Sequence, residues 1–269
     1  MLTVRTLAIL TEEAGLTGAA IGLSDLALGG RRWSIEPEAA IYPASMIKTP
    51  LAVAAAQAVA DGRAAWSERL AVDSSNMTPN DAPSPLTPDA TATLGKVVAL
   101  MLSRSDNVAT NMLFDRLDRR RASADIAALG FGETVFRRKL SGALPLIDDP
   151  EATGRNVHPA HEACRLFERL ARDELPAAHR IRRALAAQYW NTKLSTGLAP
   201  GDRFAHKTGD TDEVSHDGGI LTLTSGERYA LVVYTQLESN AETDRRFGAF
   251  MRALRPFLLR PPNATNPAA

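Results

Sequence analysis

The residues with the clearest chemical potential in this sequence are a serine and a lysine three positions apart, Ser45 and Lys48. At the predicted start of a helix, residues with this spacing share one face, so the Lys48 nitrogen can lie beside the Ser45 hydroxyl. A lysine that is desolvated near other cations has a lowered pKa and can act as a base toward serine. The helix N-terminus adds a field that favours an alkoxide or an oxyanion. The pair therefore predicts nucleophilic catalysis at Ser45.

Two further motifs supply groups that such a reaction needs. Ser105, in the run Ser105-Asp106-Asn107, can relay a proton to a leaving nitrogen or oxygen. The run Lys207-Thr208-Gly209 offers a second cation, a hydroxyl for an anionic or carbonyl group, and a glycine where substrate backbone approaches closely. A Ser-x-x-Lys match alone is equally typical of a helix cap beside a solvated lysine. The three motifs in this order favour the catalytic interpretation.

Several helices are needed to position these motifs. Apolar periodicity and capping residues predict helices at residues 3–14, 45–61, 91–102, 107–117, 158–172, 177–187 and 244–259. The stretch at residues 73–89 is rich in Ser, Thr, Pro and Asp, which predicts a surface loop. The run Arg119-Arg120-Arg121 is interpreted as a solvated helix end.

Strands are predicted near both ends of the chain, at residues 19–23, 32–35, 203–207, 219–224 and 229–234. This pattern predicts an α+β fold: an antiparallel sheet with flanking terminal helices and an inserted all-helical subdomain. The expected boundaries are residues 1–40 and 190–260 for the sheet subdomain, 41–189 for the helical one, and 261–269 for a frayed tail. A cleft between the two subdomains is the expected ligand site.

Composition narrows the classes of partner. Among the 269 residues, 31 Lys and Arg balance 31 Asp and Glu, so there is no global basic field to hold a nucleic acid. No apolar stretch approaches the roughly 20 residues that span a bilayer. Glu12 and Glu13 interrupt the N-terminal apolar run, so we expect no signal peptide and a cytoplasmic protein, or an exported one whose leader is missing from the sequence. The sequence leaves the oligomeric state open.

A metal site is not expected. Cys164 cannot form an internal disulfide because it is the single cysteine, and it is interpreted as a small buried hydrophobe. His158 and His161 precede it at three-residue spacing, but the string lacks the histidine pair and glutamate of a zinc-protease motif. His206 alternates with Lys207 on a predicted strand and is expected to face the other way.

The three motifs resemble those of the class A β-lactamases and their penicillin-recognising relatives. The resemblance includes residues 45–51, which lead into an alanine-rich helix, and residues 105–113 and 207–220, and it covers essentially the whole chain. It implies a β-lactamase-like fold, an acyl-enzyme mechanism and a small-molecule substrate, with no metal or organic cofactor.

The resemblance also implies roles for individual residues. Ser45 would accept the acyl group, Lys48 would be its base partner, and Ser105 would relay a proton. Asn107 would contact a substrate amide, and Lys207 with Thr208 would form the carboxylate site.

The resemblance also implies an oxyanion hole made by the backbone N–H groups of Ser45 and Asp210. The side chains of two residues near the third motif depart from the family pattern. The family usually has a small neutral residue at the position of Asp210 and often an arginine on the neighbouring strand, where this chain has His216. Unless Lys207 pairs with it, the Asp210 carboxylate would repel a substrate carboxylate. With both residues expected at the substrate site, a neutral ester or amide, or a substrate bearing a cation, is favoured.

A third departure concerns deacylation. In the family, a Glu-x-x-Leu-Asn motif supplies the base that activates the deacylating water, and this motif is absent here. The corresponding residues 137–151 carry carboxylates at their far end, Asp148, Asp149 and Glu151, in a pattern more typical of turn-forming surface acids. The sequence thus argues against efficient penicillin hydrolysis.

Three functions remain open at this point. The first is a β-lactamase-like serine hydrolase that forms an acyl-enzyme at Ser45. The second is a D-amino-acid peptidase, amidase or esterase on the same fold. The third is an acyl-binding or scaffolding protein without turnover, which would be labelled stoichiometrically by an acylating probe.

Overall fold

A five-stranded antiparallel sheet forms the centre of one half of the molecule. The computed structural model describes residues 1–27, 30–35, 40–140 and 154–260. The strand order is β2-β1-β7-β6-β5, and each neighbouring pair is antiparallel. The strands are β1 (Ala20–Asp25), β2 (Arg32–Ile35), β5 (Arg203–Asp210), β6 (Ser215–Thr222) and β7 (Arg228–Thr235). The predicted α+β class with an antiparallel sheet is confirmed, and the sheet joins segments from both ends of the sequence.

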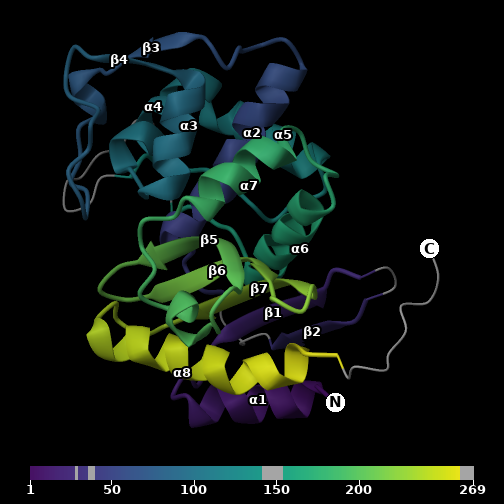
Figure 1. Cartoon of the computed structure of the whole chain (residues 1–269). Coiled ribbons are helices and arrows are strands. Elements are labelled where there is room, and N and C mark those ends of the chain that lie inside the picture. The colour runs from purple at the N-terminus through teal and green to yellow at the C-terminus, as the bar shows by residue number, and fades with distance from the viewer. Residues whose placement is uncertain (28–29, 36–39, 141–153, 261–269) are drawn as a thin grey trace.

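Two terminal helices cover one face of this sheet, α1 (Val4–Glu13) and α8 (Ala241–Leu258) (Figure 1). Alternation along the strands decides which side chains meet them. In β7, Leu231 and Val233 pack into the cluster beneath α1 and α8, whereas Val232 and Tyr234 belong to the cluster on the other face. Asn240 caps α8 by accepting a hydrogen bond from the Thr243 N–H.

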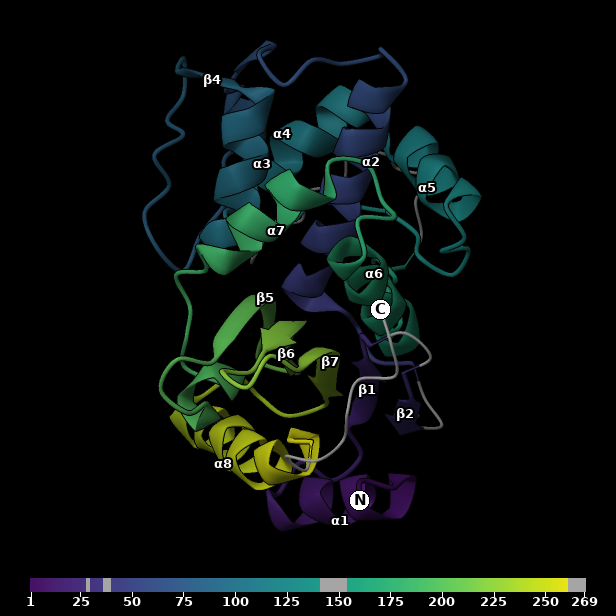
Figure 2. The same cartoon turned by 45° about the vertical axis from the view of Figure 1, so that its right-hand side comes forward.

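The remaining helices lie on the opposite side of the sheet in both views (Figures 1 and 2). Helix α2 is buried on all sides, and its alanine-rich sequence allows neighbouring helices to approach closely. The six helices of this part are α2 (Lys48–Ala60), α3 (Leu94–Ser103), α4 (Asn107–Leu117), α5 (Arg119–Ala128), α6 (Ala160–Ala171) and α7 (Ala178–Ala186). Three 3-10 segments, η1 (Ala44–Ile47), η2 (Ser74–Asn76) and η3 (Leu194–Gly197), and a small sheet of β3 (Arg69–Ala71) and β4 (Thr91–Thr93) complete the structure.

Three local details differ from the predictions. The arginine run at residues 119–121 lies at the N-terminal end of α5, a helix that the sequence analysis did not predict, because Asp118 adopts a left-handed conformation and caps this helix at the Arg121 N–H. The helix predicted at residues 91–102 begins only at Leu94, since Thr91 pairs with Ala71 in the small sheet and Thr93 makes the cap. The helix predicted from Ser45 starts as the 3-10 segment η1 and becomes α-helical only at Lys48.

No helix in residues 1–27, 30–35, 40–140 and 154–260 is both long and apolar enough to cross a membrane. The division of the chain into an inserted helical subdomain and a sheet subdomain stays a prediction, and the predicted tail at residues 261–269 lies outside the described residues.

Candidate active site

Ser45 lies in η1, at the point where the helical part of the molecule meets the edge of the sheet. The strand β5 runs directly past η1, and Gly209 permits this approach. A Cβ atom added at Gly209 would lie 3.0 Å from the Pro43 carbonyl oxygen and 3.2 Å from Met46 Cγ. Ala44, before the serine, holds a left-handed backbone conformation with φ of 44°. Strained backbone of this kind is characteristic of functional sites.

Lys48 connects the first two motifs. Its Nζ donates to the Ser105 carbonyl oxygen at 2.6 Å, to Ser105 Oγ at 3.0 Å and to Asn107 Oδ1 at 2.6 Å. The side chain is fully buried, and this burial, with the nearby charge of Lys207, lowers the pKa of Lys48 well below its usual value. An amine with a lowered pKa therefore lies three positions after Ser45 and in contact with Ser105.

The second motif is held in place by the predicted loop at residues 73–89. Asp106 caps α4 by accepting the Ala109 N–H at 2.9 Å, and its other oxygen accepts the Ser84 hydroxyl at 2.6 Å. Asn80 Oδ1 accepts the Asn107 backbone N–H at 2.6 Å. Sequence reasoning did not identify Asn80 or Ser84, because their partners lie more than twenty positions away and no local pattern marks them.

Lys207 is also fully buried, on β5. Its Nζ donates to the carbonyl oxygen of Thr208 at 2.8 Å. Burial lowers the pKa of Lys207 to about 7, although the nearby Asp210 carboxylate opposes this change. The group that was expected to bind a substrate carboxylate is thus only partly protonated near neutral pH.

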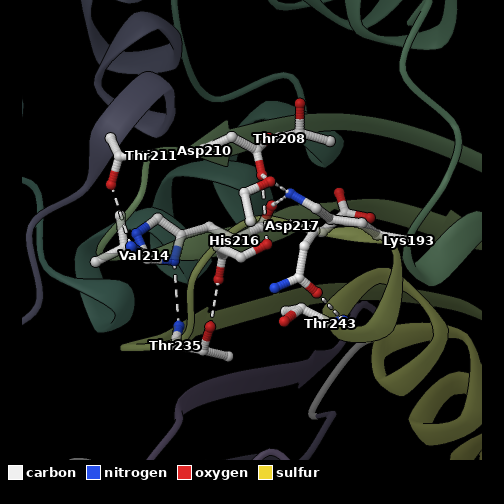
Figure 3. Close-up of polar contacts among 12 residues, drawn as sticks. Lys193, Thr208, Asp210, Thr211, Val214, His216, Asp217, Thr235 and Thr243 are labelled. Atoms are coloured by element: carbon white, nitrogen blue, oxygen red, sulfur yellow. Dashed lines mark hydrogen bonds and ion pairs between the residues drawn. The ribbon is translucent and has the colours of Figure 1, made fainter.

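Asp210 has a partner that the sequence analysis missed. Lys207 was the only partner that the sequence suggested, as a condition, but the Asp210 carboxylate forms an ion pair with Lys193, whose ammonium also donates to the His216 carbonyl oxygen at 3.2 Å (Figure 3). Asp210 also accepts the Ser239 hydroxyl at 2.6 Å and the Ser215 hydroxyl at 3.3 Å. Burial and the charge of Lys193 act in opposite directions on the pKa of Asp210, and the net effect is a lowering. The carboxylate is therefore ionised and compensated.

His216 does not occupy the position expected for a substrate contact. It is fully buried and stacks on Tyr234, with 4.3 Å between the ring centroids. Nδ1 accepts the Thr235 N–H at 3.1 Å, so the proton lies on Nε2, which donates to the Tyr42 carbonyl oxygen at 2.7 Å. Burial lowers the pKa of His216 to about 4, so the ring is neutral. Both nitrogens are used within the protein, and His216 supports the chain that leads into η1.

His206, Asp217 and Ser195 form a second polar group on the sheet. His206 Nδ1 lies 2.7 Å from Asp217 Oδ1, and Nε2 lies 3.3 Å from Ser195 Oγ, an order that resembles a hydrolase triad. However, Nε2 is closer to Asn191 Oδ1, at 3.0 Å, and the Asn191 amide is oriented by its donation to the Gln188 carbonyl oxygen. Nε2 is therefore a donor and has no lone pair to accept the Ser195 proton, so this group is structural.

Two cavities meet at Ser45. Cavity one measures about 350 Å³ and is lined by Tyr42, Ala44, Ser45, Asn107, Arg138, Lys139, Leu140, Arg155, Asn156, Asp210, Thr211, Asp212 and Glu213. Cavity two measures about 240 Å³ and is lined by Ser45, Asp81, Ser105, Trp190, Thr192, Lys193, Thr208, Asp210, Ser239 and Asp244. The predicted nucleophile thus borders both cavities, with Ser105 and Thr208 on one side and Asn107 on the other.

The structure does not test the three residues that the sequence offers as a base for deacylation. Asp148, Asp149 and Glu151 lie outside the described residues. Asp210 is the carboxylate that lines both cavities, but it is engaged by Lys193.

The histidine and cysteine string does not form a joint metal site. His158 Nδ1 contacts the Thr134 hydroxyl at 2.7 Å, and the Cys164 sulfur faces the Ala230 carbonyl oxygen at 3.8 Å. His161 instead lies near Glu133 and Glu162, with ligand atoms within 4.8 Å of one another. Glu162 already accepts the Thr134 hydroxyl and the Glu133 N–H, so its oxygens are used within the protein.

Comparisons with known proteins agree with this arrangement. A model described as the Beta-lactamase enzyme family matches residues 4–253. The comparison with curated proteins found no match. Among solved structures, PBP-A is similar with a TM-score of 0.79 and 25% identity, over 94% of this chain and 96% of that one.

A β-lactamase from Sphaerobacter thermophilus DSM 20745 has a TM-score of 0.79 and 24% identity over 97% of this chain and 100% of that one. An acyl-enzyme complex of a PBP-A point mutant with penicillin G has a TM-score of 0.75 and 24% identity over 94% and 96%. The fold is therefore β-lactamase-like, and this chain belongs to the Beta-lactamase enzyme family.

Proposed function

We propose that the protein is a serine hydrolase that forms an acyl-enzyme at Ser45 and acts on an amide or ester. The observation that carries this proposal is the buried Lys48 amine, 3.0 Å from Ser105 Oγ, with Ser105 lining one of the two cavities onto which Ser45 opens. Burial lowers the pKa of this amine and so favours its unprotonated form, which is the state that a base requires.

In the first step, Ser45 Oγ attacks the carbonyl carbon of the substrate and its proton passes to Lys48 Nζ. The negative charge that develops on the carbonyl oxygen would be met by the backbone N–H groups of Ser45 and Asp210. As the bond to the leaving nitrogen or oxygen breaks, Ser105 gives its proton to that atom and regains one from Lys48. The acyl group is then bound to Ser45, and Lys48 is again neutral.

In the second step, water attacks the acyl carbon and releases Ser45. Lys48, neutral after acylation and with a lowered pKa, can take the proton of this water and return it to Ser45 Oγ as the bond between that oxygen and the acyl carbon breaks, so that both residues regain their starting states. A lysine that serves in both steps makes deacylation slower than it would be with a dedicated carboxylate.

The charges that line cavity two favour an amidase, peptidase or esterase over an efficient β-lactamase. Cavity two contains Thr208 and Ser105, where a β-lactam carboxylate would be bound, yet it also contains Asp81 and Asp244. These charges repel a carboxylate. The structure of the PBP-A mutant is described as a penicillin G acyl-enzyme, which supports acylation by penicillins as a property that this chain shares.

Acylation is tested with a fluorescent penicillin and an activated ester, each followed by intact-mass measurement. The wild-type protein is expected to gain one acyl group, located at Ser45 by peptide mapping. Ser45→Ala should remove this label, and Ser195→Ala, which alters the other serine discussed above, should retain it. A label that persists in Ser45→Ala would refute the proposal.

Steady-state turnover of esters and penicillins distinguishes a hydrolase from an acyl-binding protein. Continuous hydrolysis of small esters with slow hydrolysis of penicillins is expected for an esterase or amidase. A burst equal to the enzyme concentration, followed by no further product from any substrate, would instead assign an acyl-binding protein without turnover.

A further inference from the structure

The two cavities receive different parts of the substrate, an inference that rests on the proposed function. Ser105 lines cavity two, whereas Asn107 lines cavity one. Because Ser105 passes its proton to the leaving atom, the leaving group lies in cavity two. The acyl group then lies in cavity one.

The described linings of the two cavities differ in charge. Cavity one carries three cationic side chains, Arg138, Lys139 and Arg155, against the three carboxylates of Asp210, Asp212 and Glu213. Cavity two carries three carboxylates and one cation. Its cation, Lys193, is paired with Asp210, so that pair is neutral. Asp81 and Asp244 therefore have no ion pair within this lining, although the charges of the buried Lys48 and Lys207 act on Asp81 from outside it.

The carboxylates of Asp81 and Asp244 have no hydrogen-bond or ion-pair partner in the part of the chain that the structure describes. The first turn of α8 gives Asp244 a favourable helix-dipole interaction. This interaction does not supply a donor for Asp244 Oδ1, which is buried without one. A buried oxygen of this kind is costly unless a ligand satisfies it.

An aromatic side chain completes the same cavity. Trp190 lines cavity two, and its indole Nε1 is engaged by the Arg104 carbonyl oxygen at 3.2 Å, which fixes the ring. A cation is attracted both by carboxylates and by the face of an indole ring. Both the carboxylates and the face of the indole ring repel an anionic leaving group.

We propose that cavity two binds a cationic nitrogen on the leaving group, so that the substrate is an amide or ester whose departing amine, alcohol or thiol carries an ammonium or guanidinium. Asp81 and Asp244 are the residues that select this charge. The acyl group in cavity one is not required to carry a charge.

The test uses three thioesters with the same phenylacetyl group and different leaving thiols. One thiol carries a trimethylammonium, the second is its uncharged carbon isostere 3,3-dimethylbutane-1-thiol, and the third is 3-mercaptopropionate. Thiol release is followed with a chromogenic disulfide, and the free thiol of Cys164 is buried. We expect kcat/KM for the cationic ester to exceed that for the neutral one by about tenfold, with the anionic ester slowest.

The variants Asp81→Asn and Asp244→Asn are each expected to reduce the advantage of the cationic ester about threefold while retaining turnover of the neutral ester. That neutral rate, with the melting temperature, shows that the variant is folded. Asp89→Asn removes the same charge from an exposed position that lines neither cavity, and should leave the ratio unchanged.

Equal rates for the cationic and neutral esters, or faster release of the anionic thiol, would overturn this inference. So would a ratio that both aspartate variants leave unaltered. These outcomes would leave the proposed function intact as long as turnover depends on Ser45. Turnover that survives in Ser45→Ala would instead contradict the proposed function, and the inference with it.

Discussion

Two buried lysines with lowered pKa values, Lys48 and Lys207, lie at the candidate site. Lys48 contacts Ser105 and Asn107, and burial lowers its pKa well below the usual value. Lys207 has a pKa of about 7 for the same main reason. Each amine is a base when neutral and a cation when protonated. We therefore expect pH to affect catalysis through Lys48 and the binding of a carboxylate through Lys207.

The rate of Ser45 acylation should therefore depend on pH in two ways. With a neutral activated ester, the rate should rise with pH at a midpoint well below the 10.5 of an ordinary lysine, because Lys48 must be unprotonated. With a penicillin, the rate should also fall above about pH 7, because Lys207 loses the charge that attracts a carboxylate. Stopped-flow labelling at a series of pH values measures both profiles.

Lys207→Arg provides the control, since a guanidinium stays charged throughout this range. It should move the alkaline decline for penicillin to higher pH and leave the ester profile unchanged. Superimposable profiles for the two probes would contradict the role given to Lys207.

The Lys193–Asp210 ion pair allows a second prediction for individual residues. Lys193→Met should slow acylation about 10- to 100-fold, because an uncompensated Asp210 carboxylate would oppose the negative charge that develops nearby. The double variant Lys193→Met with Asp210→Ser should recover most of this loss. Acylation rates of the two single variants and the double variant form a double-mutant cycle. Additive losses would show that the pair does not act as a unit.

The sequence was sufficient to predict residues that meet at the candidate site, because Ser45, Lys48 and Ser105 lie in short motifs with their own chemical logic, and the structure places Lys48 in contact with Ser105. It was not sufficient for Lys193, whose role depends on a partner seventeen positions away across a loop. The expected role of His216 was wrong because the burial of both its nitrogens depends on the packing of Tyr42 and Tyr234.

The geometry of the site depends on the close contact between the elements η1 and β5. Gly209→Ala should reduce acylation strongly, about 10- to 100-fold, with a smaller effect on the melting temperature. The reason is that the new Cβ would lie 3.0 Å from the Pro43 carbonyl oxygen, which is backbone and cannot rotate away. Gly132→Ala is the matched control, since nothing lies within 4 Å of its added Cβ. Unchanged acylation in Gly209→Ala would show that η1 tolerates displacement.

The buried His206–Asp217 pair should affect stability. It joins β5 to β6, and the second Asp217 oxygen accepts the Leu194 N–H at 3.1 Å, which anchors η3. Asp217→Ala should lower the free energy of unfolding by about 1–3 kcal/mol, because it leaves a buried imidazole N–H without its acceptor. Urea denaturation measures this, with the exposed Asp212→Ala expected to change it by less than about 0.5 kcal/mol. A small loss in Asp217→Ala would show that the pair is dispensable.

Elements with a regular apolar pattern or a long apolar run could be predicted, and those set by single caps could not. The strands of the sheet follow apolar patterns that survive in the structure, and α2 is a long apolar run that is largely buried. The separation of α4 from α5 depends on the left-handed Asp118, and the small β3–β4 sheet pairs residues such as Leu70 and Ala92 across a loop. Neither feature has a local apolar period.

The whole molecule is organised by a sheet that joins the two ends of the sequence. Strand β1 is paired on one side with β2 and on the other with β7, as in the pairing of Ile21 with Val233. The sequence predicted the α+β class because strand-like runs occur only near the ends of the chain. The order β2-β1-β7-β6-β5 follows from pairings between distant segments, which composition and period do not encode.

That arrangement has a consequence for how the protein is made. During synthesis β1 leaves the ribosome early, but β7 emerges only after residues 26–227 have been added, so the middle of the sheet stays open until the last stage. Lys207 also belongs to this late segment, whereas Ser45 is made early. Under the proposed function, the growing chain thus contains Ser45 long before Lys207 has been added, and acylation of a carboxylate-bearing substrate needs both segments.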